Sequence, residues 1–258
     1  MAPKVGVALG SGGVRGFAHL GALRVLEDHE IPIDCLAGSS MGSVVAVLYA
    51  SGIELKYLIK LAEHMRRSLL VDYTVPRFGL LKGERVRELI ALLTKNKRLE
   101  ELSIPTAVVA TDLVTGDPVV LRQGSIADAV RASISIPGIF EPVEWDGRLL
   151  VDGGVVDRVP MQVLREMGAD VVIGVDVSHK SVPVKIHSIY EVILQTIDIM
   201  ESQIFRGRIS PDDVLIRPEV GQYSPLSFQN ISEIIAEGER ATRAVIDEIA
   251  ARVWGANR

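Results

Sequence analysis

Residues 36–43 read LAGSSMGS, and at their centre Ser40 lies in the pattern G-x-S-x-G. The apolar run 31–38 leads into this pattern, and residues 41–51 follow it with the composition of a buried helix. A serine at such a strand-to-helix turn exposes its Oγ, and flanking glycines avoid clashes with the strand and the helix. The stretch therefore predicts a βα unit with Ser40 as a candidate nucleophile. A tight turn of small residues without chemistry is the alternative.

The rest of the chain alternates apolar strands with helical patterns. Strands are expected at 4–9, 31–38, 105–113, 118–123, 148–154, 169–177 and 213–220, and helices at 16–29, 41–51, 54–65, 83–95, 125–135, 160–168 and 230–253. This alternation predicts an α/β fold with a mostly parallel central sheet and helices on both faces. The length of 258 residues fits a single domain, with a core at about 5–180 and a C-terminal region of helices and a strand at 181–258.

One further helix is expected at residues 186–206. Six apolar residues fall on one of its faces, namely Ile189, Val192, Ile193, Ile197, Met200 and Ile204. We expect this face to pack on the core. A lid over the substrate, or a surface that touches a membrane, is the alternative.

Composition and charge exclude several classes of function. The net charge is −5 and no basic stripe is present, which argues against nucleic acid as a partner. The single cysteine, Cys35, lies in an apolar run and is expected to be buried, so neither a disulfide framework nor a cysteine metal cluster is expected. No apolar run reaches 18 residues, and the N-terminus lacks a cleavage site. We therefore expect no signal peptide, no transmembrane helix and a cytoplasmic location; the oligomeric state is left open.

The glycine-rich stretch GSGGVRG, residues 10–16, follows the first strand and opens a helix. Its spacing does not fit the dinucleotide or Walker A patterns, so a nucleotide site is disfavoured. The alternative is an oxyanion hole, in which backbone N–H groups stabilise developing negative charge. Arg15 would order the loop, attract an anionic head group or be solvated. The candidate residues of this loop are Gly10, Gly12, Gly13, Val14, Arg15 and Gly16.

A carboxylate motif follows in VDGGVVDRVP, residues 151–160. Asp152 ends an apolar strand and precedes Gly153 and Gly154. Open α/β sheets keep their sites at the carboxyl edge of the strands, which makes Asp152 a candidate site residue. An ordinary Asp-Gly turn is the alternative.

Together, GSGGVRG, GSSMG and DGG, in this order, resemble the patatin-like phospholipase family. The stretches 16–34 and 131–143 resemble further blocks of that family, and the likeness covers roughly the first 180 residues. The resemblance implies hydrolysis of lipid acyl esters by a Ser–Asp dyad without a cofactor or a metal, with possible peripheral contact to a membrane. Its site residues would be Ser40 as nucleophile, Asp152 as its partner, Gly38 and Gly42 as the nucleophile elbow, the loop of residues 10–16 as oxyanion hole, and the Asp152-Gly153-Gly154 motif.

The family resemblance implies that Asp152 replaces the usual histidine base. An exposed aspartate is a weak base, with a pKa of about 3.9, and burial would raise its basicity. Asp157 and Arg158, which depart from the family pattern, are expected to form an ion pair or to tune the site. A lipid-binding or regulatory module without catalysis, and a nucleotide-dependent enzyme, are the alternative functions.

The five histidines have plainer roles in this interpretation. His19 is expected to pack or hydrogen-bond near the glycine loop, and His29 and His64 to be solvated near helix ends. His187 lies in the least regular part of the chain. His179 is the one rival base.

Overall fold

The computed structural model describes residues 2–66, 68, 70–72, 79–178 and 189–255. Their strands are β1 (Val5–Leu9), β2 (Cys35–Ser39), β3 (Thr106–Asp112), β4 (Pro118–Leu121), β5 (Val143–Trp145), β6 (Arg148–Asp152), β7 (Val171–Val175) and β8 (Val214–Ile216). Their α-helices are α1 (Ala18–Asp28), α2 (Met41–Ala50), α3 (Leu55–Glu63), α4 (Glu84–Leu93), α5 (Ile126–Ser133), α6 (Met161–Glu166), α7 (Ile189–Arg206), α8 (Ile231–Arg243) and α9 (Ile246–Trp254). Short 3-10 turns cover η1 (Gly13–Phe17), η3 (Leu99–Glu101) and η4 (Gly153–Val155).

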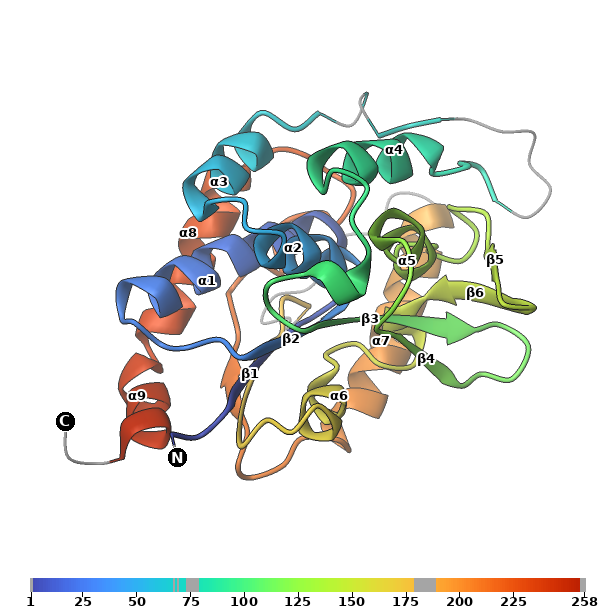
Figure 1. Cartoon of the computed structure of the whole chain (residues 1–258). Helices are drawn as coiled ribbons and strands as arrows, with labels where there is room; N and C mark the ends of the chain where they lie inside the picture. The colour runs from blue at the N-terminus through green and yellow to red at the C-terminus, as the bar shows by residue number, and fades with distance from the viewer. Residues whose placement is uncertain (1, 67, 69, 73–78, 179–188, 256–258) are drawn as a thin grey trace.

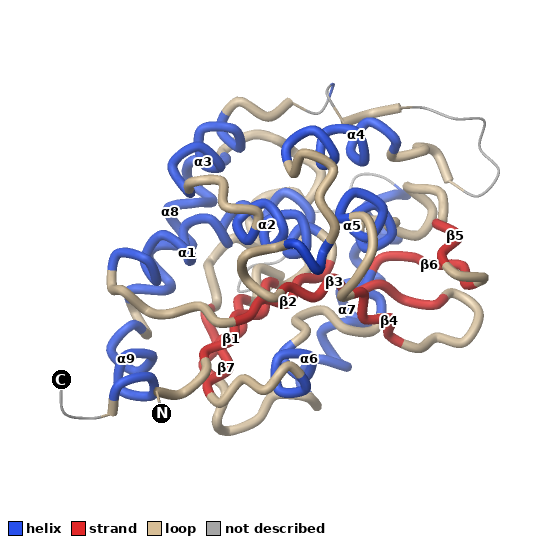
Figure 2. Tube along the Cα trace, viewed as in Figure 1, coloured by secondary structure: helices blue, strands red, loops and turns tan. Residues whose placement is uncertain are grey.

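The strands of these described residues form a single mixed sheet. Its order is β5-β6-β3-β2-β1-β7-β8, and β4 pairs with β3. The central pairs β3–β2, β2–β1, β1–β7 and β7–β8 are parallel, whereas β4 and β6 run antiparallel to β3, and β5 to β6. The sheet forms one layer between helices (Figures 1 and 2). The expected α/β fold with a mostly parallel sheet is thus confirmed.

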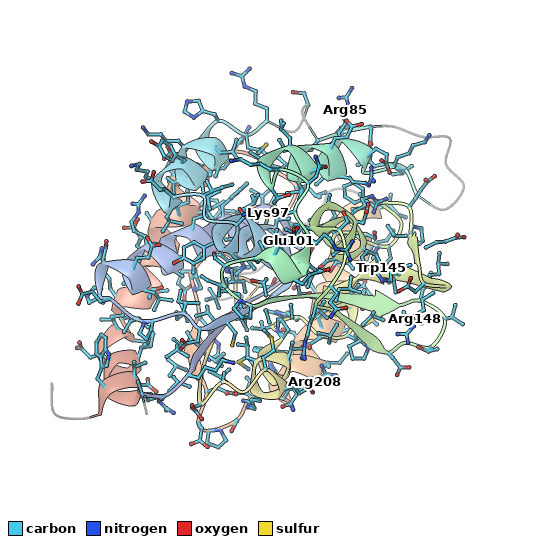
Figure 3. The ribbon with its side chains drawn as sticks, viewed as in Figure 1. Arg85, Lys97, Glu101, Trp145, Arg148 and Arg208 are labelled. Carbon is cyan, nitrogen blue, oxygen red and sulfur yellow. The ribbon has the colours of Figure 1, made fainter. Side chains whose placement is uncertain are left out.

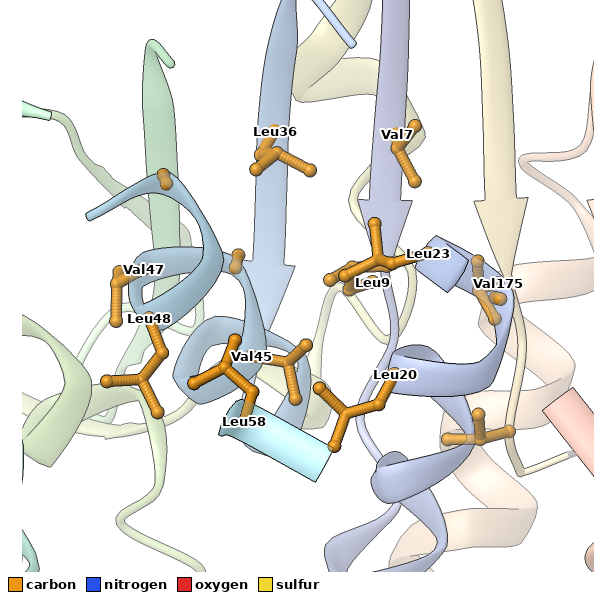
Figure 4. Packing of buried hydrophobic residues seen from close by; sticks show 14 of the residues in the cluster. Val7, Leu9, Leu20, Leu23, Leu36, Val45, Val47, Leu48, Leu58 and Val175 are labelled. Carbon is orange, nitrogen blue, oxygen red and sulfur yellow. The ribbon is translucent and has the colours of Figure 1, made fainter. Parts of the chain in front are cut away.

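Alternate residues of the central strands pack on opposite faces of the sheet. On one face, Val7 and Leu9 of β1 meet apolar residues of α1 and α2, among them Leu23 and Val45 (Figure 4). On the other face, Ala8 of β1 and residues of β2 and β3 join a second core with α6 and the end of α7. Because both faces are buried, the strands read as continuous apolar runs. Helices on both faces are confirmed, and Cys35 is buried as expected.

Two helices cross very closely on the first face of the sheet. A Cβ added to Gly21 of α1 would collide with the Ile235 carbonyl oxygen of α8, and one added to Gly238 of α8 would collide with the Ala18 carbonyl oxygen of α1. The two glycines therefore allow the helix backbones to touch. This contact fixes α8 over α1, so the C-terminal region is joined closely to the N-terminal βα unit (Figure 1).

One sequence expectation about secondary structure was wrong, and one strand was not predicted. The long helix expected at 230–253 is interrupted: α8 ends before Ala244, and Val245 leaves helical geometry with φ −123° and ψ 7°. The bend lets α8 contact α1 while α9 contacts β7. The strand β5 was not expected, because three residues with a mostly solvated pattern carry little periodic signal.

The expectation that the apolar face of α7 packs on the core was also wrong. Ile189 is 69% exposed, Val192 48% and Met200 54%, and Ile193 and Ile204 are exposed too. The opposite, polar face of the helix turns toward the sheet instead. No helix within the described ranges is long and apolar enough to cross a bilayer.

Gly238→Ala is expected to lower the free energy of unfolding by about 1–3 kcal/mol, because the added methyl group overpacks the α1–α8 crossing. The intrinsic helix preference for alanine, about 1 kcal/mol, acts in the opposite direction and makes the sign informative. Denaturant unfolding followed by circular dichroism measures the change. Gly207→Ala is the matched control, because the nearest neighbour of its Cβ, the Ile204 carbonyl oxygen, is 3.6 Å away. Equal stability of the two variants would contradict this packing.

Candidate active site

Ser40 occupies the sharp turn between β2 and α2. Its backbone has φ 52° and ψ −123°, a conformation that residues other than glycine rarely adopt. The Ser40 N–H donates to Ser133 Oγ at 2.9 Å, and Ser133 Oγ donates to the Val109 carbonyl oxygen at 2.6 Å. The Ser40 carbonyl oxygen accepts from Ser43 Oγ at 2.7 Å. The surrounding hydrogen bonds therefore hold the strained turn.

The two glycines of the elbow are required because neither position has room for a Cβ atom. A Cβ on Gly42 would collide with the Leu9 carbonyl oxygen at the end of β1, and one on Gly38 would lie 2.5 Å from Ser43 Cα. Both contacts are with backbone atoms, which do not move aside. The pattern G-x-S-x-G thus lets α2 approach the ends of β1 and β2.

Asp152 lies beside Ser40, although the two residues are 112 positions apart in the sequence. Ser40 Oγ donates to Asp152 Oδ2 at 2.6 Å, and the Gly154 N–H donates to Asp152 Oδ1 at 2.8 Å. Both side chains are buried. The arrangement is that of a hydroxyl with its proton directed at a carboxylate.

The register of an antiparallel strand brings Asp152 to this place. Ser39 pairs with Val109 of β3, and the next β3 residue, Ala110, pairs with Asp152 of β6. Asp152 therefore lies level with the carboxyl end of β2, as expected, but the strand that carries it, β6, runs antiparallel to the central strands.

Burial raises the pKa of Asp152 to about 6, against the opposing effect of the hydrogen bonds from Ser40 and Gly154, which favour the carboxylate. Desolvation penalises the charged form, and only two donors compensate it. The carboxylate is consequently a stronger base than a surface aspartate and is ionised at neutral pH.

The glycine loop contains two backbone N–H groups that have no acceptor among the described residues. The N–H groups of Gly10, Ser11 and Val14 are used by the fold and donate to the carbonyl oxygens of Val175, Arg158 and Pro225 at 3.1, 2.9 and 2.9 Å. The expectation that Val14 contributes an oxyanion donor is therefore corrected. Gly12 and Gly13 lie between these anchors, and the described residues provide no hydrogen-bond acceptor for their N–H groups.

His19 holds the same loop through a hydrogen bond to its first residue. Its ring is fully buried, which lowers its pKa to about 4, so the imidazole is neutral and its Nε2–H donates to the Gly10 carbonyl oxygen at 2.8 Å. The expected structural role of His19 is confirmed. His29 and His64 are exposed and bond carbonyl groups at helix ends, as expected. The rival base His179, like His187, lies outside the described residues.

The arginines near the site are buried and have defined partners. Arg15 donates from Nε to the Tyr223 carbonyl oxygen at 2.8 Å and lies 3.8 Å from Asp198, so it orders the loop and is not solvated. Arg158 bonds Asp176 and donates to Ser202 Oγ of α7 at 2.9 Å.

Asp157 and Arg158 do not pair with each other. Asp157 instead faces Arg208 at 3.4 Å, just beyond the end of α7 (Figure 3). Burial raises the pKa of Asp157 to about 6, while Arg208 opposes the rise. Arg158 thus contacts α7 at Ser202, and Asp157 contacts the chain just after the end of this helix.

A large apolar cavity opens at Ser40. Its volume is about 460 Å³, within the range of ligand pockets. Its walls come from α2, α3 and α4, together with residues 134–140 and 225–228, and include Val44, Leu48, Leu58, Leu89, Ile90 and Phe140. No cluster of three or more histidine, cysteine or acidic residues suited to a metal ion occurs in the described part of the chain.

Residues 7–165 match the family model of the patatin-like phospholipases. The chain belongs to the patatin-like phospholipase family. An uncharacterized NTE family protein of Mycobacterium tuberculosis is 39% identical over 178 residues, which cover 68% of this chain and 49% of the relative. The patatin-like phospholipase domain-containing protein 6 of Mus musculus is 33% identical over 181 residues, covering 67% of this chain and 13% of its own length. The chain therefore spans half or less of these curated relatives.

Solved structures show the same patatin-family fold at low sequence identity. VipD from Legionella pneumophila has a TM-score of 0.71 and 14% identity, covering 96% of this chain and 67% of its own. The type III effector protein ExoU has a TM-score of 0.56 and 14% identity, covering 98% of this chain and 54% of its own. These likenesses concern the fold.

Sequence reasoning missed Glu201 of α7, whose buried carboxyl group lies against the glycine loop of the patatin-type site. Glu201 Oε2 lies 3.3 Å from Ser11 Oγ in the glycine loop, and Oε1 lies 2.9 Å from the point where a Cβ on Gly154 would be. Burial first, and then the charges of Asp152 and Asp198, raise its pKa well above that of a surface glutamate. Burial and the neighbouring Asp152 charge thus both favour the protonated form of Glu201. No local pattern distinguishes Glu201 from a solvated helix residue.

Glu201→Gln is expected to leave the pKa of Asp152 unchanged at about 6, because glutamine imitates a protonated carboxyl group in shape and charge. Isotope-edited NMR titration of the carboxyl carbons measures this value, with Glu88→Gln on the exposed face of α4 as the control for loss of an acidic residue. A fall in the pKa of Asp152 in Glu201→Gln alone would show that Glu201 carries a negative charge, and would contradict the protonated state.

Proposed function

We propose that this chain is a serine acyl-ester hydrolase that acts on lipids, similar to a phospholipase A or a lysophospholipase. The single observation that carries the proposal is the 2.6 Å hydrogen bond from Ser40 Oγ to a buried Asp152 at the mouth of an apolar cavity. Membership of the patatin-like phospholipase family supports the same reaction class. The proposal needs no cofactor.

In the proposed first step, Ser40 Oγ attacks the ester carbonyl carbon while Asp152 Oδ2 accepts the hydroxyl proton. The carbonyl oxygen becomes an oxyanion, and the N–H groups of Gly12 and Gly13 stabilise its charge. Asp152 then gives the proton to the departing alcohol as the C–O bond breaks, which leaves an acyl-Ser40 ester. A water molecule attacks this ester while Asp152 accepts its proton. Asp152 then returns the proton to Ser40 Oγ as the bond between the acyl carbon and Oγ breaks, and the fatty acid leaves.

The cavity beside Ser40 is proposed to hold the acyl chain. Its walls are almost entirely apolar, and Met41 and Val44 lie beside the nucleophile in its lining. Burying methylene groups there contributes about 0.8 kcal/mol for each group. Binding of the chain would place the ester carbonyl at the Ser40 turn, between the dyad and the glycine loop.

Ser40→Ala and Asp152→Asn are each expected to lower kcat for an acyl ester by about 1000-fold or more, because they remove the nucleophile and the base. Wild-type kcat/KM should rise with pH and level off above about pH 6, where Asp152 is ionised. Hydrolysis of p-nitrophenyl esters gives the rates, and a labelled fluorophosphonate reports modification of Ser40.

Ser39→Ala is the matched control for this test. Ser39 is the neighbouring serine in the same motif, and its Oγ has no hydrogen-bond partner among the described residues, so its loss should leave turnover nearly unchanged. A turnover in Asp152→Asn equal to that of the wild type would show that Asp152 is not the base. Tight lipid binding by a folded wild type without any turnover would instead identify a lipid-binding module.

Leu89→Trp is expected to lower kcat/KM for a long-chain ester by about tenfold or more relative to a butyryl ester, since the indole fills space for two or three methylene groups. Leu92→Trp on the same helix is the control, because Leu92 is 74% exposed and lies outside the cavity wall. Chain-length profiles with p-nitrophenyl esters measure the effect. An unchanged profile in Leu89→Trp would contradict the acyl role of the cavity.

A further inference from the structure

The outer face of α7 is the largest gathering of exposed apolar side chains in the described residues. Six of the eleven large apolar residues that are exposed lie on this one helix, whereas the others are scattered over α3, α4, α9 and the turn after β3. The six are Ile189, Val192, Ile193, Ile199, Met200 and Ile204. Contiguous apolar surface of this kind marks an interaction site on a folded protein.

The inner face of the same helix is polar and has specific partners. Asp198 pairs with Arg15 and Arg158, Ser202 accepts from Arg158 at 2.9 Å, and Glu201 is buried against Ser11. These contacts would be lost if the helix turned about its axis. The apolar face is therefore held outward by the network that surrounds the candidate active site.

The acidic side chains Asp198 and Glu201 of α7 are turned inward, and the exposed charge at the end of its apolar face comes from arginines. The six exposed apolar residues form a stripe, here called the α7 stripe, and no described side chain within it is charged. At one end of the stripe, exposed Arg206 and Arg217 line a hollow of about 290 Å³ together with Ile199. Asp176 and Asp198 also line this hollow, and both pair with the buried Arg158. Apolar side chains that enter a membrane, bordered by arginines that meet anionic head groups, are the two components of interfacial binding.

A second copy of this chain fits the α7 stripe less well. Six partly exposed side chains on one convex helix offer on the order of a few hundred Å², whereas a stable interface buries about 800 Å² on each partner. A lipid surface needs neither a matching shape nor a large area.

We propose that the α7 stripe docks this protein on an anionic lipid bilayer, with its apolar side chains in the interface and Arg206 and Arg217 at the head groups. The proposal rests on the proposed lipid hydrolase function, and it names a surface that would hold the protein at a lipid bilayer. Because Glu201 and Asp198 of the same helix contact the glycine loop region, docking places the candidate site next to the bilayer.

The test measures binding and catalysis separately. The Ser40→Ala protein, which does not consume lipid, is sedimented with vesicles of phosphatidylcholine and phosphatidylglycerol, or of phosphatidylcholine alone. We expect binding to the mixed vesicles, weaker binding to the neutral ones, and a further decrease at high salt. Adding Val192→Gln and Met200→Gln should lower the partition coefficient by about tenfold or more. The control pair is Leu92→Gln with Val114→Gln, two residues that are 74% and 81% exposed elsewhere.

Several outcomes would overturn docking without touching the proposed reaction. They are absence of vesicle binding by Ser40→Ala, equal loss of binding in the stripe and control variants, and an unchanged partition coefficient in the stripe variant. Conversion of a dimer to a monomer by the stripe variant in sedimentation velocity would assign the stripe to a second copy. In the protein that retains Ser40, turnover of a soluble butyryl ester should be the same with and without the stripe substitutions. If the wild-type protein did not hydrolyse this soluble ester, the hydrolase proposal would be overturned, whatever the result of the vesicle experiment.

Discussion

The hydrogen bond from Ser40 to Asp152 depends on a dry environment, and much of the architecture serves to supply it. An aspartate in water keeps its proton too weakly to act as a general base near neutrality. Here β6 ends against β3, α5 covers the turn from one side, and the carboxylate receives only two donors. The same burial that costs stability when the carboxylate ionises raises its pKa to about 6. A site that opened to water would lose this property even with both residues in place.

In this protein, accepting a proton and holding the glycine loop fall to two different side chains. Asp152 has the geometry to accept a proton, whereas the buried neutral imidazole of His19 holds the Gly10 carbonyl oxygen and shapes the glycine loop. N–H groups of that loop donate to β7 and to residue 225. The N–H groups of Gly12 and Gly13 lie between these two anchors. A preorganised loop of this kind stabilises charge without having to reorganise during the reaction.

Local sequence was sufficient for those parts of the site in which geometry is encoded within a few residues. The elbow around Ser40 requires glycines because backbone atoms of Leu9 and Ser43 leave no room for a Cβ, and that requirement is visible as G-x-S-x-G. The contribution of Asp152 depends on an antiparallel register, which no pattern near residue 152 reveals; the family resemblance supplied it. Glu201 and the break at Val245 escaped because each depends on what the helix packs against, and not on its own periodicity.

The α7 helix shows most clearly what hydrophobic periodicity cannot predict. The spacing of its apolar residues predicts a helix with two different faces, and it is silent about which face turns inward. That choice depends on the surface beneath the helix, which here contains Arg15, Arg158 and the hydroxyl of Ser11. Buried arginines demand carboxylates and hydroxyls as partners, since an unpaired buried charge is strongly destabilising. The polar face of α7 satisfies that demand, and its apolar face is exposed as the direct consequence.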